Sequence, residues 1–235
     1  MKKEKYIKIG NSIKNLLIQI DFVCLLEESF FRKKNICFDL SINNKVLLDI
    51  KNRTPNFLSE YIKQTFSETG AFWGSGGYGE KRNIYQASLN FQNNEKVRDI
   101  HLGLDIWMPA GVEIFAPIGG VIHSFKDNNQ SFDYGPTIII EHKINDIIFY
   151  TLYGHLSRMS LLGLRKGLKI VAGQRIARVG EETENGCWPT HLHFQIIGDL
   201  MGMNGDFPGV SSKEDSEMYL NLCPDPKLLF KILDK

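Results

Sequence analysis

The chain has 235 residues, which is enough for one full domain plus an extension around a sizeable buried core. Its 28 lysines and arginines nearly balance 27 acidic residues, and no basic run marks one face, so we expect no nucleic-acid partner. No stretch reaches the roughly 18 uncharged residues that a membrane-spanning helix requires, so we expect no membrane partner.

The N-terminus starts with basic residues followed by apolar ones, as a secretory signal peptide does. However, Lys14 and Asp21 interrupt the apolar part, and no cleavage site of small residues follows it. The sequence therefore predicts a cytoplasmic protein. No C-x-x-C pair is present, and four widely separated cysteines fit reduced thiols. These are Cys24, Cys37, Cys187 and Cys223.

Two elements are predicted before residue 51. Apolar residues recur at near-helical spacing over residues 11–33, which predicts a helix there. The run ICFDLSINNKVLLDI follows, with Asn43 and Asn44 between two β-rich halves. This pattern predicts a hairpin over residues 36–50.

A second helix is predicted to begin at Thr54 and Pro55, which fit its N-cap and first helical position. It should continue to about Phe66. Together these helices and the hairpin define an N-terminal extension over residues 1–69. We expect this extension to enlarge the fold rather than to close over a groove as a lid.

The texture changes at GAFWGSGGYGEKRN, residues 70–83, where five glycines alternate with Phe72, Trp73 and Tyr78. No Gly-Lys-Ser/Thr follows, so a phosphate-binding loop is not indicated. The composition fits neither a helix nor a regular strand. We expect an ordered loop that carries its aromatic residues at the rim of a groove, with a purely structural loop as the alternative.

From residue 100 onward, short β-rich runs alternate with Gly, Pro and Asn turns. This is the pattern of a mostly antiparallel β domain. The predicted fold class is therefore mostly β, with an antiparallel β-sheet domain over residues 70–235 and a mixed α/β extension before it.

Two pairs of polar residues could bind a metal. RDIHLGLDIWMPAG places His101 four residues before Asp105, which on an ideal strand is about 13 Å along the same face. A shared metal would need a bend between them, and Gly103 permits one. In THLHFQII, His191 and His193 alternate on a predicted strand, so both imidazoles should face the same side.

Zinc accepts imidazole and carboxylate ligands, and a catalytic zinc keeps three protein ligands and a water. His101 and Asp105 supply two ligands, and either His191 or His193 supplies the third. The other histidine of that pair would then lie near the metal-bound water, where His155 could be a second proton-transfer group. The two remaining histidines carry no such pattern and are assigned to the fold or the surface. These are His123 and His142.

Four motifs resemble, in sequence and order, the lysostaphin or LytM-type zinc metallopeptidases. They are RDIHLGLDIWMPAGVEIFAPIGGVIHSF, YGPTIIIEHKINDIIFYTLYGHLS, GLKIVAGQRIARVG and HLHFQII, and the resemblance covers residues 98–197. It implies the duplicated-hybrid-motif fold, an antiparallel β architecture with a groove across its main sheet. It also implies one zinc per chain and hydrolysis of peptide bonds in bacterial cell-wall crosslinks.

The resemblance assigns the individual residues. His101, Asp105 and His193 match the zinc ligands of the family, and His155 and His191 match its two catalytic histidines.

A closer variant is also similar to this chain. GGYGEKR, NGCWPTHLHFQII, GDFPGV and LCPDP resemble the peptidase module that lies between kinase-like and class III aminotransferase domains in three-part bacterial proteins. The stretch CWPTHLH departs from the small, Gly-containing stretch that usually precedes H-x-H in cell-wall enzymes. We expect Trp188 and Pro189 to reshape that wall of the groove.

The resemblance implies a zinc-dependent peptidase or amidase, with an endopeptidase acting on peptidoglycan stem or crosslink peptides as its family form. Three alternatives stay open. The protein could hydrolyse a cytosolic peptide outside the wall, or be a non-hydrolytic groove-binding or regulatory module of the same fold. It could also be a phosphocarrier, because sugar-transport phosphocarrier domains share the fold and use paired histidines.

Overall fold

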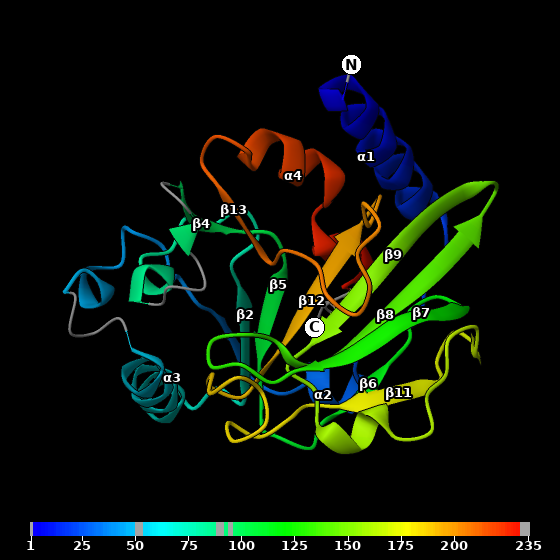
Figure 1. Cartoon of the computed structure of the whole chain (residues 1–235). Helices are drawn as coiled ribbons and strands as arrows, with labels where there is room; N and C mark the ends of the chain where they lie inside the picture. Colours follow the sequence, from blue (N-terminus) through cyan, green and yellow to red (C-terminus); the bar gives the residue numbers. More distant parts are fainter. Residues whose placement is uncertain (1, 50–53, 88–91, 94–95, 231–235) are drawn as a thin grey trace.

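The computed structural model describes residues 2–49, 54–87, 92–93 and 96–230. Over this part of the chain, the largest element is an eight-stranded sheet whose neighbouring strands are antiparallel except for the first pair (Figure 1). In spatial order its strands are β1 (Asn35–Cys37), β2 (Trp73–Gly76), β5 (Leu104–Trp107), β12 (His191–Ile197), β9 (Ile147–Gly154), β8 (Gly135–Ile144), β7 (Gly120–Asn128) and β10 (Lys169–Ile170).

Two smaller sheets complete the described β structure. The first pairs β6 (Glu113–Phe115) with β11 (Arg175–Arg178), and the second joins β13 (Val210–Ser212), β4 (Lys96–His101) and β3 (Gln92–Asn93). The protein is therefore mostly β with a large antiparallel sheet, which confirms the predicted fold class.

The central strands separate a core from a pocket, because successive strand residues face opposite sides of a sheet. One face of β5 and β12 is fully buried in the main hydrophobic cluster and carries Leu104, Ile106, Leu192, Phe194 and Ile196. The other face lines the pocket and carries Asp105, Trp107, His191 and His193.

The helices lie around this sheet (Figure 1). They are α1 (Lys2–Gln19), α2 (Glu28–Phe31), α3 (Pro55–Thr69) and α4 (Ser216–Leu222), with short 3₁₀ turns η1 (Lys45–Leu47), η3 (Ile84–Ala87), η5 (Arg158–Leu161) and η6 (Pro226–Leu229). Helix α1 packs against α4, and α3 lies at the β1 and β2 end of the molecule.

The helix predicted over residues 11–33 is wrong in its extent, because α1 ends at Gln19 and only the single turn α2 follows. Between them the backbone pairs with a distant segment instead of with itself. The amide of Val23 donates to the carbonyl of Pro117, and the carbonyl of Leu25 accepts from the amide of Phe115. These long-range hydrogen bonds outweigh the local helical pattern.

The hairpin predicted over residues 36–50 is also wrong across its described part. Strand β1 pairs in parallel with β2, and no second strand follows it up to residue 49. The Asn44 side chain instead accepts from the amide of Val46 and caps η1. Three apolar side chains of this segment are buried, and their packing replaces a strand pairing. They are Phe38, Leu40 and Leu47.

The second predicted helix is confirmed. In α3 the hydroxyl of Thr54 accepts from the amide of Phe57 at 3.2 Å, and Pro55 occupies the first turn. The helix continues slightly beyond the predicted end, to Thr69, where Gly70 takes the left-handed conformation that suits a C-terminal cap.

Residues 70–83 contain a strand that the glycine-rich composition concealed. Strand β2 is buried along its whole length and lies between β1 and β5. Gly74 is required there because the Phe38 ring packs on its Cα, where a Cβ would overlap the ring. The predicted aromatic rim is therefore wrong. None of its three members lines the pocket: Phe72, Trp73 and Tyr78.

The N-terminal extension adds to the main sheet through β1, and the domain division at residues 69 and 70 stays a prediction. None of the helices in the described part of the chain combines the length and apolar character needed to span a membrane. The four cysteines are free thiols in the structure, and they are Cys24, Cys37, Cys187 and Cys223.

Candidate metal centre

Strands β5 and β12 bring three of the candidate residues together. Their register places His193 opposite Asp105 and His191 opposite Trp107. Both histidines face the pocket, as the alternation of strand residues predicts. The packed core on the far side of these strands holds the polar face in place.

His101 approaches Asp105 because the chain bends between β4 and β5. The two strands belong to different sheets, and Gly103 lies in the turn between them. The Gly103 Cα packs against the His193 ring so closely that a Cβ would overlap ring atoms. The bend brings Nε2 of His101 to 3.2 Å from Oδ1 of Asp105. The predicted bend at Gly103 is confirmed.

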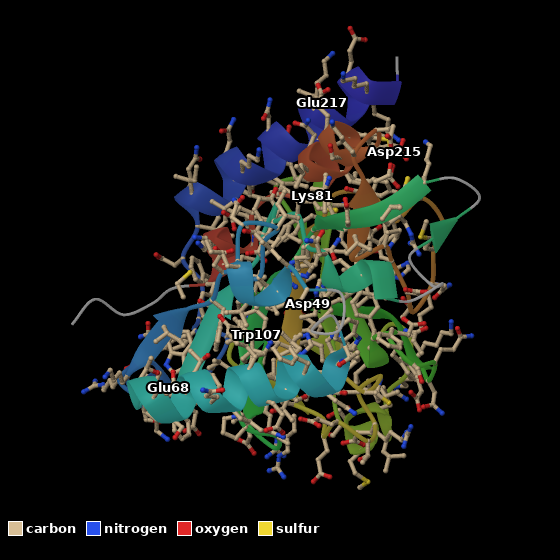
Figure 2. All side chains as sticks on the ribbon, turned by 90° about the vertical axis from the view of Figure 1, so that its left-hand side faces the viewer. Asp49, Glu68, Lys81, Trp107, Asp215 and Glu217 are labelled. Atoms are coloured by element: carbon tan, nitrogen blue, oxygen red, sulfur yellow. The ribbon has the colours of Figure 1, made fainter. Side chains whose placement is uncertain are left out.

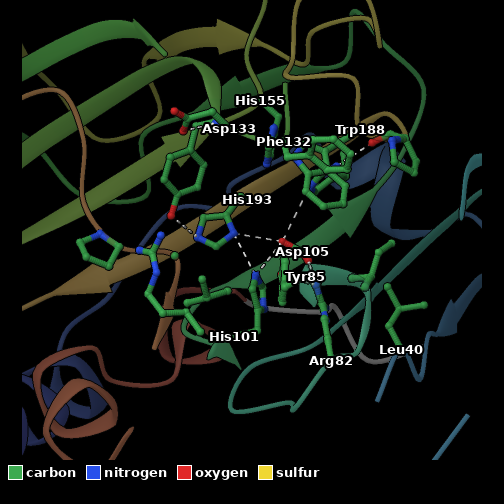
Figure 3. A pocket seen from close by; sticks show the side chains of 18 of the residues that line it. Leu40, Arg82, Tyr85, His101, Asp105, Phe132, Asp133, His155, Trp188 and His193 are labelled. Carbon is green, nitrogen blue, oxygen red and sulfur yellow. Dashed lines mark hydrogen bonds and ion pairs between the residues drawn. The ribbon is translucent and has the colours of Figure 1, made fainter. Parts of the chain in front are cut away.

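Three atoms of metal-ligand type form a small triangle in the pocket (Figure 3). Nε2 of His101 lies 3.0 Å from Nδ1 of His193, which lies 3.1 Å from Oδ1 of Asp105. Ligands at about 2.0–2.2 Å from a tetrahedral zinc are separated by about 3.4 Å. The triangle is therefore close to one face of a zinc tetrahedron.

The hydrogen bonds behind the rings decide which nitrogens carry lone pairs. Nδ1 of His101 donates to the carbonyl of Gly77, so its Nε2 is the unprotonated atom. The amide nitrogen of Gln195 donates to the carbonyl of Pro208, so the Gln195 oxygen must accept from Nε2 of His193. Nδ1 of His193 is then unprotonated as well, and both lone pairs face Oδ1 of Asp105.

Three converging acceptors without a proton between them repel one another unless a cation neutralises them. A proton cannot serve well here, because burial, reinforced by Arg82, lowers the pKa of His101 to about 4. Burial alone would raise the pKa of Asp105, but His101 and Arg82 outweigh it and hold that pKa well below its usual range. The donor set therefore fits a divalent metal such as zinc.

His155 and His191 lie beside the triangle and keep one nitrogen free. Nδ1 of His155 donates to the carbonyl of Asn185 at 2.8 Å, and Nδ1 of His191 donates to the carbonyl of Pro189 at 2.6 Å. Their ring centres are 4.1 Å apart. Burial lowers the pKa of both rings, and each positive charge would disfavour a second one nearby. Both are neutral at pH 7, with Nε2 available as a base.

The pocket is a cavity of about 350 Å³ with walls of different character. Figure 3 shows Leu40 and Asp133 on opposite sides of His193. One side is largely apolar and consists of Leu40, Leu58, Ile84, Tyr85, Trp107, Phe132, Trp188 and Pro189. The other side carries Arg98, Asp133 and Asp206. Trp188 and Pro189 thus lie in the groove wall, and Leu40 and Leu58 of the N-terminal extension close its apolar end.

Two polar residues of the site were not predicted from the sequence. Gln195 follows His193 at strand spacing, so alternation alone could have placed it on the same face. Arg82 donates from Nη1 to Oδ2 of Asp105 at 2.6 Å, and no local pattern announces this ion pair. His123 and His142 do not line the pocket.

The fold and this donor set define a class of protein: a mostly antiparallel β protein with a His/Asp/His metal-binding cluster in a groove. Residues 99–204 match the sequence model of Peptidase family M23. This part of the chain, which contains all five candidate residues, belongs to that family.

Solved structures similar to this chain include three peptidases. The catalytic domain of lysostaphin, an antimicrobial peptidase from Staphylococcus simulans, shares 23% identity at a TM-score of 0.38, over 61% of this chain and 94% of that one. The catalytic domain of the prophage-encoded M23 protein EnpA from Enterococcus faecalis shares 24% identity at 0.36, over 50% and 85%. A zinc-containing peptidase from Vibrio cholerae shares 25% at 0.35, over 45% and 29%.

The present chain thus spans less than a third of the Vibrio cholerae peptidase. No curated protein matches the chain. At these TM-scores the structural likenesses carry no argument, and the family assignment rests on the match over residues 99–204.

Proposed function

We propose that this protein is a zinc-dependent peptidase that hydrolyses a peptide bond with an activated water. His101, Asp105 and His193 hold one zinc, and His155 and His191 transfer protons. The observation that carries the proposal is the triangle of three unprotonated acceptors with two neutral imidazoles beside it. The M23 family match supports the peptidase class.

Zinc at such a site lowers the pKa of a water toward 7 and polarises the scissile carbonyl. The protein's own contribution is proton transfer. Nε2 of His155 and Nε2 of His191 carry free lone pairs, so either ring can accept the proton of the attacking water. The acquired proton then passes to the leaving amine, because a buried imidazolium beside a second imidazole gives its proton up readily.

Asn185 and Pro189 have a separate task. Their carbonyls accept from Nδ1 of His155 and His191 and so keep Nε2 of both rings directed at the reacting groups. His191 Nε2 is 3.8 Å from Oδ1 of Asp105, which limits it to the edge of the metal site rather than its ligand set. This spacing supports the division between ligands and proton-transfer groups.

For the substrate we propose a peptide, with peptidoglycan stem or crosslink peptides as the first candidate because of the family resemblance. A second candidate, a cytoplasmic peptide unrelated to the wall, is favoured by the apolar side of the pocket. Phe132 and Trp188 pack edge-on with ring centres 5.6 Å apart, and Tyr85 contacts Trp188 from another direction. Such a wall suits a bulky apolar side chain better than a glycine bridge. The cytoplasmic location itself stays a prediction.

The test is a digest of purified peptidoglycan and of a synthetic peptide library, with and without a chelator, read by mass spectrometry. We expect metal-dependent cleavage that Asp105→Ala abolishes. Cleavage that persists in the chelator or in Asp105→Ala contradicts a zinc mechanism. Tight zinc binding without cleavage of any peptide favours the non-hydrolytic module.

The phosphocarrier alternative has a physical objection in the structure. Oδ1 of Asp105 is 3.1 Å from Nδ1 of His193, so a phosphoryl group on that nitrogen would lie against a carboxylate. Two like charges at this distance in a buried site are strongly unfavourable. Incubation with a phosphoryl donor should give no phosphohistidine at His193.

A further inference from the structure

The segment from Gly77 to Arg82 runs beside β4 and is hydrogen-bonded to it. The amide of Gly79 donates to the carbonyl of His101, and the amide of His101 donates to the carbonyl of Glu80, each at 2.9 Å. The amide of Arg82 donates to the carbonyl of Asp99 at 2.8 Å. This register fixes the segment against the residue that begins the metal site.

The Arg82 guanidinium lies between two carboxylates and is only 3% exposed. Nη1 donates to Oδ2 of Asp105, and Nε donates to Oε2 of Glu80, both at 2.6 Å. The remaining Glu80 oxygen accepts from the amide of Leu40 at 2.9 Å. A continuous chain of charged contacts thus connects the N-terminal extension to Asp105.

The same segment also holds His101. The Gly77 carbonyl accepts from Nδ1 of His101, and Gly77 has a φ of 102°, which favours glycine. The Arg82 guanidinium packs on the Gly77 Cα, where a Cβ would overlap Nη2. Two of the three candidate ligands are therefore oriented by one short stretch of chain.

Stability alone is a weak reason for such an arrangement. A buried ion pair is often no more stabilising than apolar side chains of the same volume, because both charges must be desolvated. Geometry is a better reason. A carboxylate can bind a metal through one oxygen or through two, and a guanidinium that occupies one oxygen leaves only the other.

We propose that Arg82 is a positioning residue of the metal centre: it occupies Oδ2 of Asp105 and thereby restricts this carboxylate to one-oxygen coordination through Oδ1. Glu80 holds Arg82 in place from the opposite side. The restriction keeps a coordination position open for water. This inference rests on the metal-binding half of the proposed function and is independent of hydrolysis.

The test uses the full chain loaded with Co²⁺, whose visible absorption is strong in four-coordinate sites and weak in five-coordinate ones. The variants are Arg82→Met, Arg82→Lys and Glu80→Gln. Lys81→Met is the matched control, because Lys81 is the neighbouring cation but is partly exposed and pairs with Asp99. Zinc affinity is measured for each variant by competition with a chromophoric chelator.

We expect the wild-type protein and Lys81→Met to give the strong four-coordinate spectrum. Arg82→Met should give a weaker, five-coordinate spectrum as Asp105 binds through both oxygens, and its zinc affinity should fall about 10–100-fold, as is typical when a partner behind a ligand is removed. Arg82→Lys and Glu80→Gln should shift in the same direction by smaller amounts.

An unchanged cobalt spectrum and zinc affinity in folded Arg82→Met overturns the proposal. If Arg82→Met does not fold, wild-type values in both Arg82→Lys and Glu80→Gln overturn it instead. A wild-type protein that binds neither metal overturns this inference together with the zinc site. A normal metal response without peptide cleavage leaves Arg82 as proposed and contradicts only the hydrolytic function.

Discussion

The protein buries two clusters of polar side chains, and their hydrogen bonding differs. In the core cluster on β8 and β9, Nδ1 of His142 donates to the carbonyl of Gly119, and its Nε2 is hydrogen-bonded to the hydroxyl of Thr151. That hydroxyl also contacts the hydroxyl of Tyr153 at 3.1 Å. Both ring nitrogens therefore have a partner within the protein.

In the metal-site cluster, each histidine has one nitrogen anchored by a protein acceptor and the other left with a lone pair. For His101 and His193 these lone pairs meet Oδ1 of Asp105, and for His155 and His191 they face the pocket.

The difference shows what identifies a site. Burial lowers the pKa of His142 to about 4, which is the same value that burial and Arg82 give His101. A lowered pKa thus occurs in both clusters and does not separate them. Unsatisfied lone pairs that converge on one point, or that open onto a cavity, do separate them.

The largest effect is expected from Asp105→Ala, which removes the only anionic ligand of the triangle. Two neutral imidazoles make a poor site, so most of the bound zinc should be lost. Elemental analysis of the purified protein measures this. Asp133→Asn, which changes a carboxylate in the same pocket outside the triangle, should keep its zinc. Full occupancy in Asp105→Ala would contradict the ligand assignment.

The next largest effect should separate proton transfer from metal binding. His155→Ala and His191→Ala should each lose about 10²–10⁴-fold in turnover, the usual contribution of general acid–base catalysis. Their zinc content should stay at the wild-type level. Rates on whichever peptide the digest identifies, together with zinc analysis, provide the measurement. His123→Ala is the control, since that ring lies outside the pocket. Loss of zinc from a folded His191 variant would redraw the ligand set.

The core cluster should reveal itself through stability rather than activity. The pKa of His142 is near 4 in the folded state and 6.5 in the unfolded one, so between these values the unfolded chain binds a proton that the folded chain does not. The free energy of unfolding should therefore fall as the pH drops from 6.5 to 4, by about 3 kcal/mol from this residue. Above pH 6.5 the residue makes no difference.

Denaturant titrations of the metal-free protein across this range test the point. His142→Gln should show a shallower fall than the wild type. His123→Gln should change the slope less, because that ring is less buried. Identical slopes for wild type and His142→Gln would show that the core histidine is not the titrating group.

The smallest effect concerns the anchor behind His193. Gln195→Leu removes the acceptor for Nε2 of His193, so that ring loses its fixed tautomer. Zinc affinity should fall by about 10–100-fold. Gln195→Glu keeps an acceptor at the same place and should restore most of the affinity. If the Leu variant binds zinc as tightly as the wild type, the ring is held by its packing against Gly103 and Tyr134 alone.

The sequence predicted most of the ligand geometry because it follows from short-range rules. Alternation along a strand places His191 and His193 on one face, and a glycine permits the bend that brings His101 to Asp105. The division between ligands and proton-transfer groups came from the family resemblance and stays a prediction until it is tested.

The features that were missed depend on long-range pairing. The contact between Arg82 and Asp105 spans 23 residues and depends on the register of the segment beside β4. Strand β2 was hidden because its glycines suit close packing against Phe38, which is visible only in the folded chain. The hairpin failed for the same reason, since β1 finds its partner in β2 rather than in its own neighbours.

The main sheet ends in two short strands, with three residues in β1 at one edge and two in β10 at the other. A long, flat edge would offer a row of unpaired backbone groups on which a second molecule could add its own strand. These edges offer only a few such groups, and β10 carries Lys169 there. The described sheet is therefore poorly suited to templating aggregation, and concentrated protein should resist growth into fibrils through its sheet edges.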